Sequence, residues 1–528
     1  MANQIIDTGN AVLGIEFGST RIKAVLIGPD HSVISSGSYE WENEYVNGIW
    51  TYSADAILTG LKSCYADLKK NVADQFGTTI KKLRSIGISA MMHGYLAFDR
   101  DMNMLVPFRT WRNTITGEAA AQLTELFNFN MPQRWSLSHL YQAVLNKEEH
   151  LSRIDFMTTL AGWVHCLLTD EKVIGIGDAS GIMPIDSLNP DYDAGMVSKF
   201  ENKVKEYGFN WNLKEMLPRV LVAGEKAGCL TKQGSLLLDA DGDLEPGIPL
   251  CPPEGDAGTG MTATNSVRER TGNVSAGTSI FSMVVLSKPL SRVYEAIDIV
   301  TTPSGKPVAM VHCNSCTSDI NAWVGLFREF ANLFGVRIDS GDLYTGLFKE
   351  AMKGDRDCGG LVNFNYYAGE PVTEIYEGRP LFVRMPDAKF SLANFMRVQI
   401  YAAMETLKYG MDIMNRENVA IDRIYGHGGL FKTKGVAQNL LSAAIKAPVT
   451  VMETAGEGGA WGIALLAQYM TDRNDGETLE DYLQDRVFGK MNQLTVEPDP
   501  DDIEGFDRYM ESFVKCIPVQ KAAIENFK

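Results

Sequence analysis

Residues 248–286 read IPLCPPEGDAGTGMTATNSVRERTGNVSAGTSIFSMVVL, and two glycine-containing turns in this stretch indicate the fold and the chemistry of the chain. Asp256 lies within Gly255–Gly260, where small neighbours let a ligand approach closely and leave the carboxylate unobstructed, as a general base requires. Gly272–Ser279 then leads into Ile280–Leu286, an apolar run rich in β-branched residues that predicts a strand. A Gly-Thr-Ser turn between strands can direct N–H groups and hydroxyls at phosphate oxygens.

A second turn of the same build lies near the N-terminus. Two apolar runs within Val12–Ile27 flank Glu16-Phe17-Gly18-Ser19-Thr20, which predicts another hairpin with a small polar tip. Taken alone, the turn around Asp256 and the turn Gly272–Ser279 are each more typical of an ordinary surface loop or hairpin. The two hairpins with Gly-Ser/Thr tips together suggest two similar half-structures that hold a polyphosphate between them.

Composition limits the classes of protein. A chain of 528 residues exceeds one hydrophobic core, so two or three domains are expected. The net charge of −17 and pI near 5.0 argue against nucleic acid or an anionic membrane as partner. The first seven residues lack a secretory pattern and no apolar run reaches membrane-span length, so a cytoplasmic location is expected. Eight cysteines include one CxxC pair, Cys313–Cys316, which without a second pair favours a structural role over a metal site.

The first half predicts the element order β-β-β-α-β, with a meander to Trp41, a helix over 53–75 and a strand over 82–89. Polar loops should follow that last strand. His93, in the loop after it, can donate to a substrate hydroxyl or serve as a structural histidine. The loop Pro107–Thr114 can stack on a sugar face, although Trp111 could equally be a core residue.

Gly175–Met183 predicts a further turn of small residues. Its Asp178 is a weaker catalytic candidate than Asp256. The expected role of Asp178 is to accept hydrogen bonds from the backbone of its own turn.

From residue 266 onward the strand and helix order of the first half recurs, which suggests a diverged internal repeat. Helices are expected over 319–334 and 390–415, and a short strand, 423–425, enters the glycine-rich segment Gly426–Phe431. That strand–turn–helix pattern resembles a nucleotide-binding turn. Thr454–Ala467 predicts a helix whose small first residues allow a flat ring or another helix to approach.

The order of these motifs over residues 12–467 resembles the FGGY carbohydrate kinases of the actin-like ATPase superfamily. Gly14–Lys23 is similar to the first phosphate motif of the family and Gly272–Ser279 to the second. Gly426–Leu430 together with Gly456–Ala464 resembles the adenosine motif. Met92-His93-Gly94 is similar to the sugar-contact loop of xylulokinases, and Trp111-Arg112-Asn113 resembles a loop on the substrate side.

This resemblance implies an α/β fold of two ribonuclease-H-like (actin-like ATPase) domains, each a mixed sheet flanked by helices, with a cleft between them. The expected boundaries are 1–264 for the sugar-binding domain with the first phosphate motif, 265–475 for the second phosphate and adenosine motifs, and 476–528 for an acidic, partly helical extension. The implied activity transfers the γ-phosphoryl group of ATP, with Mg²⁺, to a hydroxyl of a sugar. The acceptor that the resemblance favours is a ketopentose such as xylulose. Sugar and ATP are the expected partners, without nucleic acid or membrane, and a homodimer is one expected assembly.

The resemblance also implies a role for individual residues. Asp256 matches the catalytic aspartate of the family. Glu16 and Asp256 are also expected to bind the metal ion. The substrate-binding candidates are Met92, His93, Gly94, Trp111, Arg112 and Asp256. The ATP-binding candidates are Gly18, Ser19, Thr20, Lys23, Gly277, Thr278, Ser279, Gly428, Gly429, Gly458 and Gly459.

Two positions depart from the family pattern. Glu16 stands where the family usually has aspartate, and Ala257 stands where xylulokinases have asparagine. These departures leave open a kinase for another ketose, an aldose or a polyol, and also a sugar- and nucleotide-binding sensor with weak transferase activity. An actin-like or Hsp70-like ATPase without a small-molecule acceptor is a third alternative, which the Met-His-Gly loop disfavours.

Overall fold

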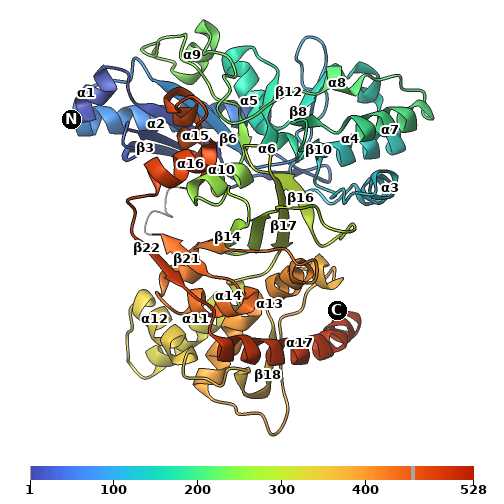
Figure 1. The fold of residues 1–528 in the computed structure, drawn as a ribbon, viewed down its shortest axis with the longest axis vertical. Coiled ribbons are helices and arrows are strands. Elements are labelled where there is room, and N and C mark those ends of the chain that lie inside the picture. Colours follow the sequence, from blue (N-terminus) through green and yellow to red (C-terminus); the bar gives the residue numbers. More distant parts are fainter. Residues whose placement is uncertain (1, 453–457, 528) are drawn as a thin grey trace. The chain divides into compact units, whose positions relative to one another are not determined.

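The computed structural model describes residues 2–452 and 458–527 (Figure 1). The chain divides into two compact units. The first comprises the described parts of Met1–Val267, Asp298–Val308 and Gly456–Lys490, and the second those of Arg268–Ile297, Ala309–Ala455 and Met491–Lys528. Within the described ranges, no helix combines the length and apolar character that a membrane span needs.

The main sheet of the first unit has the strand order β13-β6-β1-β2-β3. β1, β2 and β3 form an antiparallel meander, while β6 runs parallel to β1 and β13 parallel to β6. This arrangement confirms the predicted β-β-β-α-β order. The sheet consists of β1 (Val12–Phe17), β2 (Arg21–Ile27), β3 (Val33–Glu40), β6 (Ser85–Ala90) and β13 (Glu254–Gly255).

Helices cover both faces of this sheet. α2 (Ala54–Phe76) begins at Ser53, whose hydroxyl accepts from the N–H of Ala56, and packs on β3 at Gly37. α15 (Gly458–Asp472) packs on β1 at Gly14, where an added Cβ would lie 2.1 Å from the carbonyl oxygen of Ala460. Each glycine therefore lets a helix backbone touch the sheet directly.

The other elements of the first unit lie between and after these strands. The helices are α1 (Ala2–Asp7), α3 (Gly117–Phe127), α4 (Ser136–Asn146), α5 (Leu160–Thr169), α6 (Ile176–Ala179), α7 (Ala194–Lys205), α8 (Leu213–Met216), α9 (Lys232–Leu238), α10 (Asp256–Ala263) and α16 (Leu479–Tyr482). The short strands are β4 (Glu44–Val46), β5 (Ile49–Thr51), β7 (Leu96–Phe98), β8 (Phe156–Thr158), β9 (Val173–Gly175), β10 (Ile185–Asp186), β11 (Asp191–Tyr192), β12 (Arg219–Leu221) and β16 (Asp298–Thr301).

The sheet of the second unit repeats the core pattern of the first. β14 and β15 form an antiparallel hairpin, and β20 runs parallel to β14, as β6 does to β1. The strand order is β17-β15-β14-β20-β21-β22. The strands are β14 (Thr271–Ala276), β15 (Ile280–Val285), β17 (Pro307–Cys313), β20 (Arg423–His427), β21 (Val449–Met452) and β22 (Gln493–Val496), with β18 (Leu361–Phe364) and β19 (Leu381–Arg384) as a separate pair.

The helices of the second unit are α11 (Ser318–Leu333), α12 (Ser340–Ala351), α13 (Leu392–Arg416), α14 (Ala437–Ile445) and α17 (Pro500–Asn526). α13 is buried along most of its length and contacts α12, α14 and β18. The two mixed sheets with flanking helices confirm the expected α/β fold of two domains.

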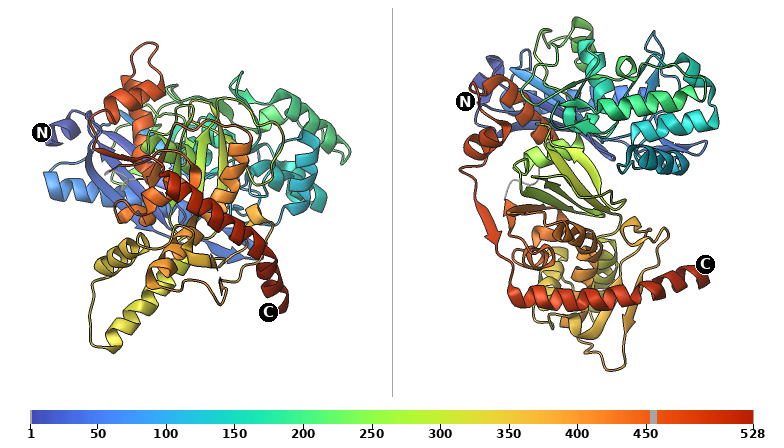
Figure 2. Two further views of the ribbon diagram at one scale, coloured as in Figure 1. Left: turned by 60° about the horizontal axis from the view of Figure 1, so that its bottom comes forward. Right: turned by 45° about the vertical axis from the view of Figure 1, so that its right-hand side comes forward.

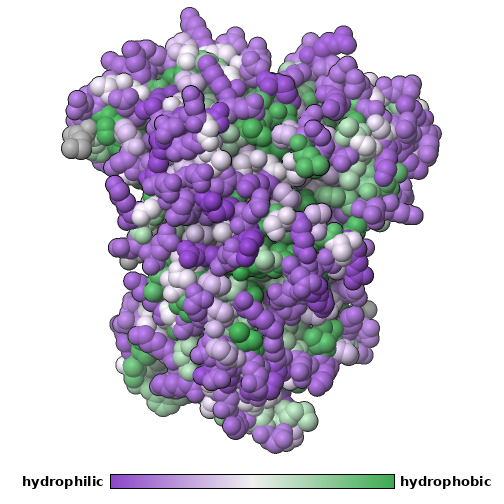
Figure 3. Space-filling model, in the orientation of Figure 1, coloured by the Kyte–Doolittle hydropathy of each residue, from purple (hydrophilic) through white to green (hydrophobic). Residues whose placement is uncertain are grey.

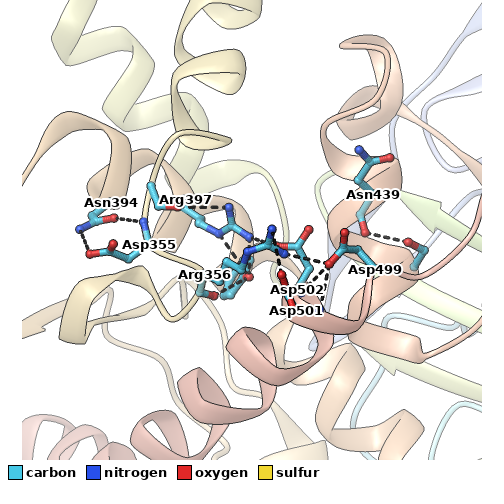
Figure 4. A network of polar contacts seen from close by, with 11 residues as sticks. Asp355, Arg356, Asn394, Arg397, Asn439, Asp499, Asp501 and Asp502 are labelled. Carbon is cyan, nitrogen blue, oxygen red and sulfur yellow. Dashed lines mark hydrogen bonds and ion pairs between the residues drawn. The ribbon is translucent and has the colours of Figure 1, made fainter.

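Residues 491–527 of the acidic C-terminal segment are part of the second unit. β22 pairs with β21, and α17 packs on α14 and β18. Two arginines form ion pairs with the acidic start of α17. Arg397 pairs with Asp502 at 2.5 Å and Arg356 pairs with Asp499 at 2.8 Å (Figure 4).

The compact units do not follow the linear boundaries expected from the sequence. Residues 458–490, expected in the second domain and the extension, group with the first unit. The physical reason is the small-residue face of α15: an added Cβ at Gly462 would lie 2.0 Å from the carbonyl oxygen of Thr259 in α10. Only a helix without side chains at such points packs that closely.

Two local expectations were wrong. The glycine-flanked turn around Asp256 is a strand–helix junction, with Asp256 as the first residue of α10. The turn expected over Gly175–Met183 is instead the end of β9 followed by the one-turn helix α6. In both places small residues allow helical packing against neighbouring backbone, which local composition does not distinguish from a turn.

Candidate active site

Asp256 projects from the N-terminal end of α10, directly after the edge strand β13. Its side chain is exposed, and its Oδ1 accepts a hydrogen bond of 3.0 Å from the N–H of Met92. The protein atoms crowded around the carboxylate raise its pKa, and the N–H groups of Met92 and Ala257 oppose this shift. The structure therefore brings the Met92–Gly94 loop and Asp256 together.

His93 is held within this loop by an unusual backbone conformation. Its φ is 71° and that of Gly94 is 89°, so two successive residues adopt left-handed conformations. The His93 ring is only 5% exposed, stacks on Trp135 with centroids 6.1 Å apart, and places Nδ1 3.4 Å from the carbonyl oxygen of Gly181. Its contact with a sugar stays a prediction.

Glu16 lies at the end of β1 against the first turn of α15. Its Oε2 accepts from the N–H of Ala460 at 3.2 Å, and an added Cβ at Gly459 would lie 2.2 Å from Oε1. Burial and, to a smaller extent, the negative charge of Asp256 raise the pKa of Glu16 to about 7, against the opposing effect of Lys23. Gly459, expected as a nucleotide contact, thus makes room for Glu16 at the helix N-terminus.

A second acidic pair lies beneath Asp256. Glu254 accepts from the N–H groups of Gly177 at 3.2 Å and Asp178 at 2.9 Å, and burial raises its pKa to about 8. Asp178 accepts from the hydroxyl of Thr159 at 2.6 Å, which corrects the expected bonds to its own turn. Burial and the charge of Asp256 raise the pKa of Asp178 to about 7. The sequence analysis did not single out Glu254 as a candidate site residue, since its position near Asp256 in the chain was the only sequence feature that pointed to it.

The first phosphate turn, Gly18–Thr20, is held by aromatic side chains. Trp41 Nε1 donates to the carbonyl of Gly18 at 2.7 Å, and the Tyr52 hydroxyl donates to the carbonyl of Ser19 at 2.6 Å. Trp41 and Tyr52 stack with centroids 4.1 Å apart. Trp111 Nε1 adds a 3.3 Å bond to Ser19 Oγ. Neither Trp41 nor Tyr52 was singled out from the sequence, because their partners are backbone atoms distant in the chain.

Trp111 and Arg112 form part of the surface of the first unit. Trp111 is 37% exposed, so the core alternative is wrong for it. Arg112 lies over the ring of Trp50 at 4.0 Å and donates to Asn43 Oδ1 at 2.9 Å. Of the expected substrate-side loop, Trp111 and Arg112 are therefore exposed while Asn113 is buried, and Trp111 bonds to the turn at Ser19.

In the second unit, Gly277–Ser279 and Gly428–Gly429 meet at the carboxyl ends of the parallel strands β14 and β20. Gly428 has φ 108°, and an added Cβ would lie 2.3 Å from the carbonyl oxygen of Ala276. Only glycine satisfies both conditions. The two glycine turns thus lie side by side, and their contact with a nucleotide stays a prediction. Gly458 belongs to the first unit, and residues 456 and 457 of the adenosine motif lie outside the described residues.

The loop after β17 supports the second phosphate turn. The N–H of Cys316 donates to the carbonyl of Thr278 at 2.9 Å, and the Thr317 hydroxyl donates to that of Gly277 at 2.8 Å. Glu370, which is fully buried, holds this loop by accepting from the N–H groups of Asn314 at 3.0 Å and Ser315 at 2.6 Å.

The same loop contains the CxxC pair, and its contribution comes from the backbone. Cys313 and Cys316 are free and at most 1% exposed, and burial raises the pKa of both thiols. A buried, protonated thiol is a poor nucleophile and metal ligand. Glu370 was missed from the sequence, because a lone glutamate after a predicted strand carries no signal of a partner 55 residues earlier.

The chain matches known proteins over most of its length. Residues 11–257 match the N-terminal domain of the FGGY family of carbohydrate kinases, and residues 272–471 match the C-terminal domain. Xylulose kinase of Haemophilus influenzae is 21% identical over 416 residues, which cover 75% of this chain and 77% of that protein.

Solved structures share the fold. Xylulose kinase from Rhodospirillum rubrum superimposes with a TM-score of 0.77 at 16% identity, over 97% of this chain and 100% of the other. Plasmodium falciparum glycerol kinase with ADP superimposes with a TM-score of 0.76 at 13% identity, over 97% of this chain and 98% of the other.

Proposed function

The chain belongs to the FGGY family of carbohydrate kinases, and from this premise we propose that it transfers the γ-phosphoryl group of ATP to a hydroxyl of a ketopentose such as xylulose. Membership implies a phosphotransferase with an alcohol acceptor. The proposal rests on one observation above all: the exposed carboxylate of Asp256 is oriented by the N–H of Met92, within the loop that resembles a sugar-contact loop.

Asp256 is proposed as the general base. Its Oδ1 is engaged by Met92, so Oδ2 is the atom that would take the proton of the acceptor hydroxyl. A pKa raised above the ordinary aspartate value makes the carboxylate a better proton acceptor. Met92, His93, Gly94, Trp111 and Arg112 are proposed to contact the sugar.

The phosphate groups of ATP are proposed to bind at the small-residue turns. The carbonyls of Gly18 and Ser19 are bonded to Trp41 and Tyr52, so these turn carbonyls already have partners within the protein. Such a held turn can present N–H groups and hydroxyls to phosphate oxygens. We further propose Gly277, Thr278, Ser279, Gly428 and Gly429 as nucleotide contacts of the second domain, 265–475, with sugar binding assigned to 1–264. Thr20, Lys23, Gly458 and Gly459 complete the proposed set.

Glu16 and Asp256 fit the requirements of Mg²⁺. Mg²⁺ commonly takes one or two protein carboxylates together with phosphate and water oxygens. The mutual repulsion that raises the pKa of Glu16 is relieved when a cation binds beside the two groups. In the described ranges no three or more His, Cys, Asp or Glu side chains gather as a metal cage. When bound, Mg²⁺ would offset the charge on the phosphates.

The choice of a ketopentose rests on the resemblance of the Met92–Gly94 loop to the sugar-contact loop of xylulokinases. The fold resembles a xylulose kinase and a glycerol kinase almost equally, with TM-scores of 0.77 and 0.76. Ala257 offers no side-chain donor beside Asp256. A panel of pentuloses, hexuloses, aldoses and polyols, assayed for ADP release with Mg²⁺ and ATP, will identify the acceptor. If none of them stimulates ADP release, the proposed function is refuted.

Asp256→Asn tests the base. Asparagine can still accept from Met92 through Oδ1 but cannot take the proton, so we expect sugar-dependent turnover to fall about 10²–10⁴-fold. ATP binding, measured by calorimetry, should change little. Asp74→Asn, at an exposed acid of α2 in the same unit, serves as the control. Undiminished turnover in Asp256→Asn would show that another group is the base.

A second candidate function is a sugar- and nucleotide-binding sensor with weak transferase activity. The observation that favours it is the engagement of Glu16 by the N–H of Ala460, which competes with metal binding. Slow turnover combined with tight binding of both ligands would support the sensor. Turnover in the ordinary range of kinases, about 1–100 per second, would exclude it.

A further inference from the structure

A groove lies between α13, α14 and α17 of the second unit. Two cavities of about 380 Å³ and 620 Å³ form it, and both are lined by Asp412, Arg416 and Asp507. We call the joined space the α13–α17 groove. Each cavity has a volume within the range of about 300–1,000 Å³ that is typical of small-molecule sites.

The walls of the groove are helices that pack on one another. The ring of Tyr401 on α13 stacks on that of Phe506 on α17 with centroids 3.9 Å apart, and the hydroxyl of Tyr509 donates to Glu405 at 2.5 Å. Figure 2 shows α17, the long red helix, beside the orange helices of the same unit. Over the position that α17 has in Figure 1, Figure 3 shows hydrophobic residues between hydrophilic ones. The groove is therefore bounded by packed helices that carry both kinds of side chain.

Three basic and two acidic side chains line the smaller cavity. The ammonium group of Lys408, whose side chain is 1% exposed, pairs with Asp412 at 2.6 Å and with Asp507 at 3.3 Å. Lys446 pairs with the other oxygen of Asp507 at 2.8 Å. These four charges balance. Arg416 is exposed and forms no ion pair within residues 2–452 and 458–527, so one positive charge at this end has no partner.

Apolar side chains line the larger cavity. They come from Tyr409 on α13 and from Met510 and Val514 on α17, of which the last two are 7% and 44% exposed. Glu511 and Lys515, at the same cavity, carry opposite charges four residues apart on α17. The larger cavity therefore offers an apolar wall next to the unpaired cation of the smaller one.

The chemistry of the two ends indicates the class of ligand. A guanidinium binds phosphate through two parallel N–H···O bonds, so Arg416 suits a phosphate group. Lys446 adds a second cation beside it. The two aspartates at that end are already paired with lysines, so an anion rather than a metal ion fits there. An apolar body attached to the anion would cover the wall of the larger cavity.

Helix α14 separates the groove from the glycine turn of the same unit. α14 follows the turn at Gly428–Gly429 and ends at Ile445, with Lys446 as its C-cap residue. Its 9 residues span about 13 Å at 1.5 Å per residue. A small ligand bound at Lys446 therefore leaves the glycine turn unoccupied.

We propose that the α13–α17 groove is a second ligand site, which binds a phosphate monoester that carries an apolar or aromatic group. The phosphate binds to Arg416 and Lys446, and the apolar group packs against Tyr409, Met510 and Val514. This inference is independent of the proposed catalytic function.

Phenyl phosphate is the probe for this site. A titration of the whole chain, followed by saturation-transfer NMR up to about 10 mM ligand, measures a dissociation constant in the range expected for so small a molecule. Arg416→Met should raise this constant about tenfold or more, because charge-assisted hydrogen bonds to the phosphate are lost. Lys389→Met, at a lysine of the same unit whose side chain is 74% exposed, is the matched control and should leave it unchanged.

Two competitors test the two ends of the groove. Inorganic phosphate lacks the apolar body, so it should displace the probe only at a concentration higher by about tenfold or more. A saturating concentration of ATP should not displace the probe, because α14 separates the groove from the glycine turn. Circular dichroism checks the folding of both variants, whose replaced side chains are exposed.

Four results would overturn the proposal. They are a wild type that does not bind phenyl phosphate, an Arg416→Met variant that binds it as the wild type does, an equal loss of binding in Lys389→Met, and displacement of the probe by ATP. Inorganic phosphate that competes on equal terms would overturn it as well, because the apolar wall would then contribute nothing.

Discussion

The substitution Tyr52→Phe tests how the first phosphate turn is held. The Tyr52 side chain is 1% exposed and its hydroxyl donates to the carbonyl of Ser19 at 2.6 Å. Phenylalanine keeps the ring that stacks on Trp41 and removes only the donor. The change therefore removes the polar contacts of one hydroxyl, with Ser19 and with the Asn43 side chain, and keeps the packing around it.

The expected cost follows from the partner left behind. A polar group that loses its only buried partner costs about 1–3 kcal/mol, unless water replaces the donor. We expect the free energy of unfolding of the first unit to fall by that amount. Its unfolding transition should therefore move to a lower denaturant concentration. If the loss falls on the turn itself, the KM for ATP should rise, by about tenfold for each 1.4 kcal/mol.

The assay compares Tyr52→Phe with Tyr45→Phe. Tyr45 lies on the neighbouring strand β4, is 63% exposed, and its hydroxyl makes no hydrogen bond within the described residues. Urea unfolding and steady-state kinetics are measured for both, with ATP and sugar varied separately. If Tyr52→Phe matches Tyr45→Phe in stability and in the KM for ATP, the hydrogen bond from Tyr52 to the carbonyl of Ser19 does not position the turn.

Three further predictions concern the second unit. Gly428→Ala places a Cβ 2.3 Å from a carbonyl oxygen at φ 108°, so we expect a loss of about 1–3 kcal/mol in urea unfolding and weaker ATP binding in calorimetry. Gly429→Ala, with open space around it, should leave the urea midpoint unchanged. Burial raises the pKa of Glu370 to about 7 from an unfolded value near 4.5. Its contribution to stability should therefore decline as pH rises from about 4.5 to 7, by up to about 3 kcal/mol, and Glu370→Gln should abolish this part of the pH dependence of the urea midpoint. Arg397→Met removes a cation whose side chain is 2% exposed and leaves its acidic partner without it, so thermal unfolding should show a loss of about 3 kcal/mol, whereas Lys389→Met, at a lysine 74% exposed, should change little.

The amino-acid sequence by itself determined the elements and their order. The hairpins of residues 12–27 and 271–285, the helices near 54–76 and 392–416, and the repeated order of strands follow from apolar periodicity and from turn residues. These signals are local. The buried face of a strand or helix is visible in the sequence as apolar residues two to four positions apart. This spacing does not depend on what the element packs against.

The tertiary structure decided which of these elements meet. It joined Met92 to Asp256 across 164 residues of chain, Ala460 to Glu16 across 444, and Ser315 to Glu370 across 55. It also placed α15 with the first unit, because Gly14 lets the α15 backbone touch β1 and Gly462 of α15 lets the α10 backbone approach. Hydrogen bonds to main-chain N–H and carbonyl groups leave no pattern in side-chain identity, since every residue except proline carries both groups. The partners of Asp256, Glu16 and Glu370 therefore became visible only once the chain was folded.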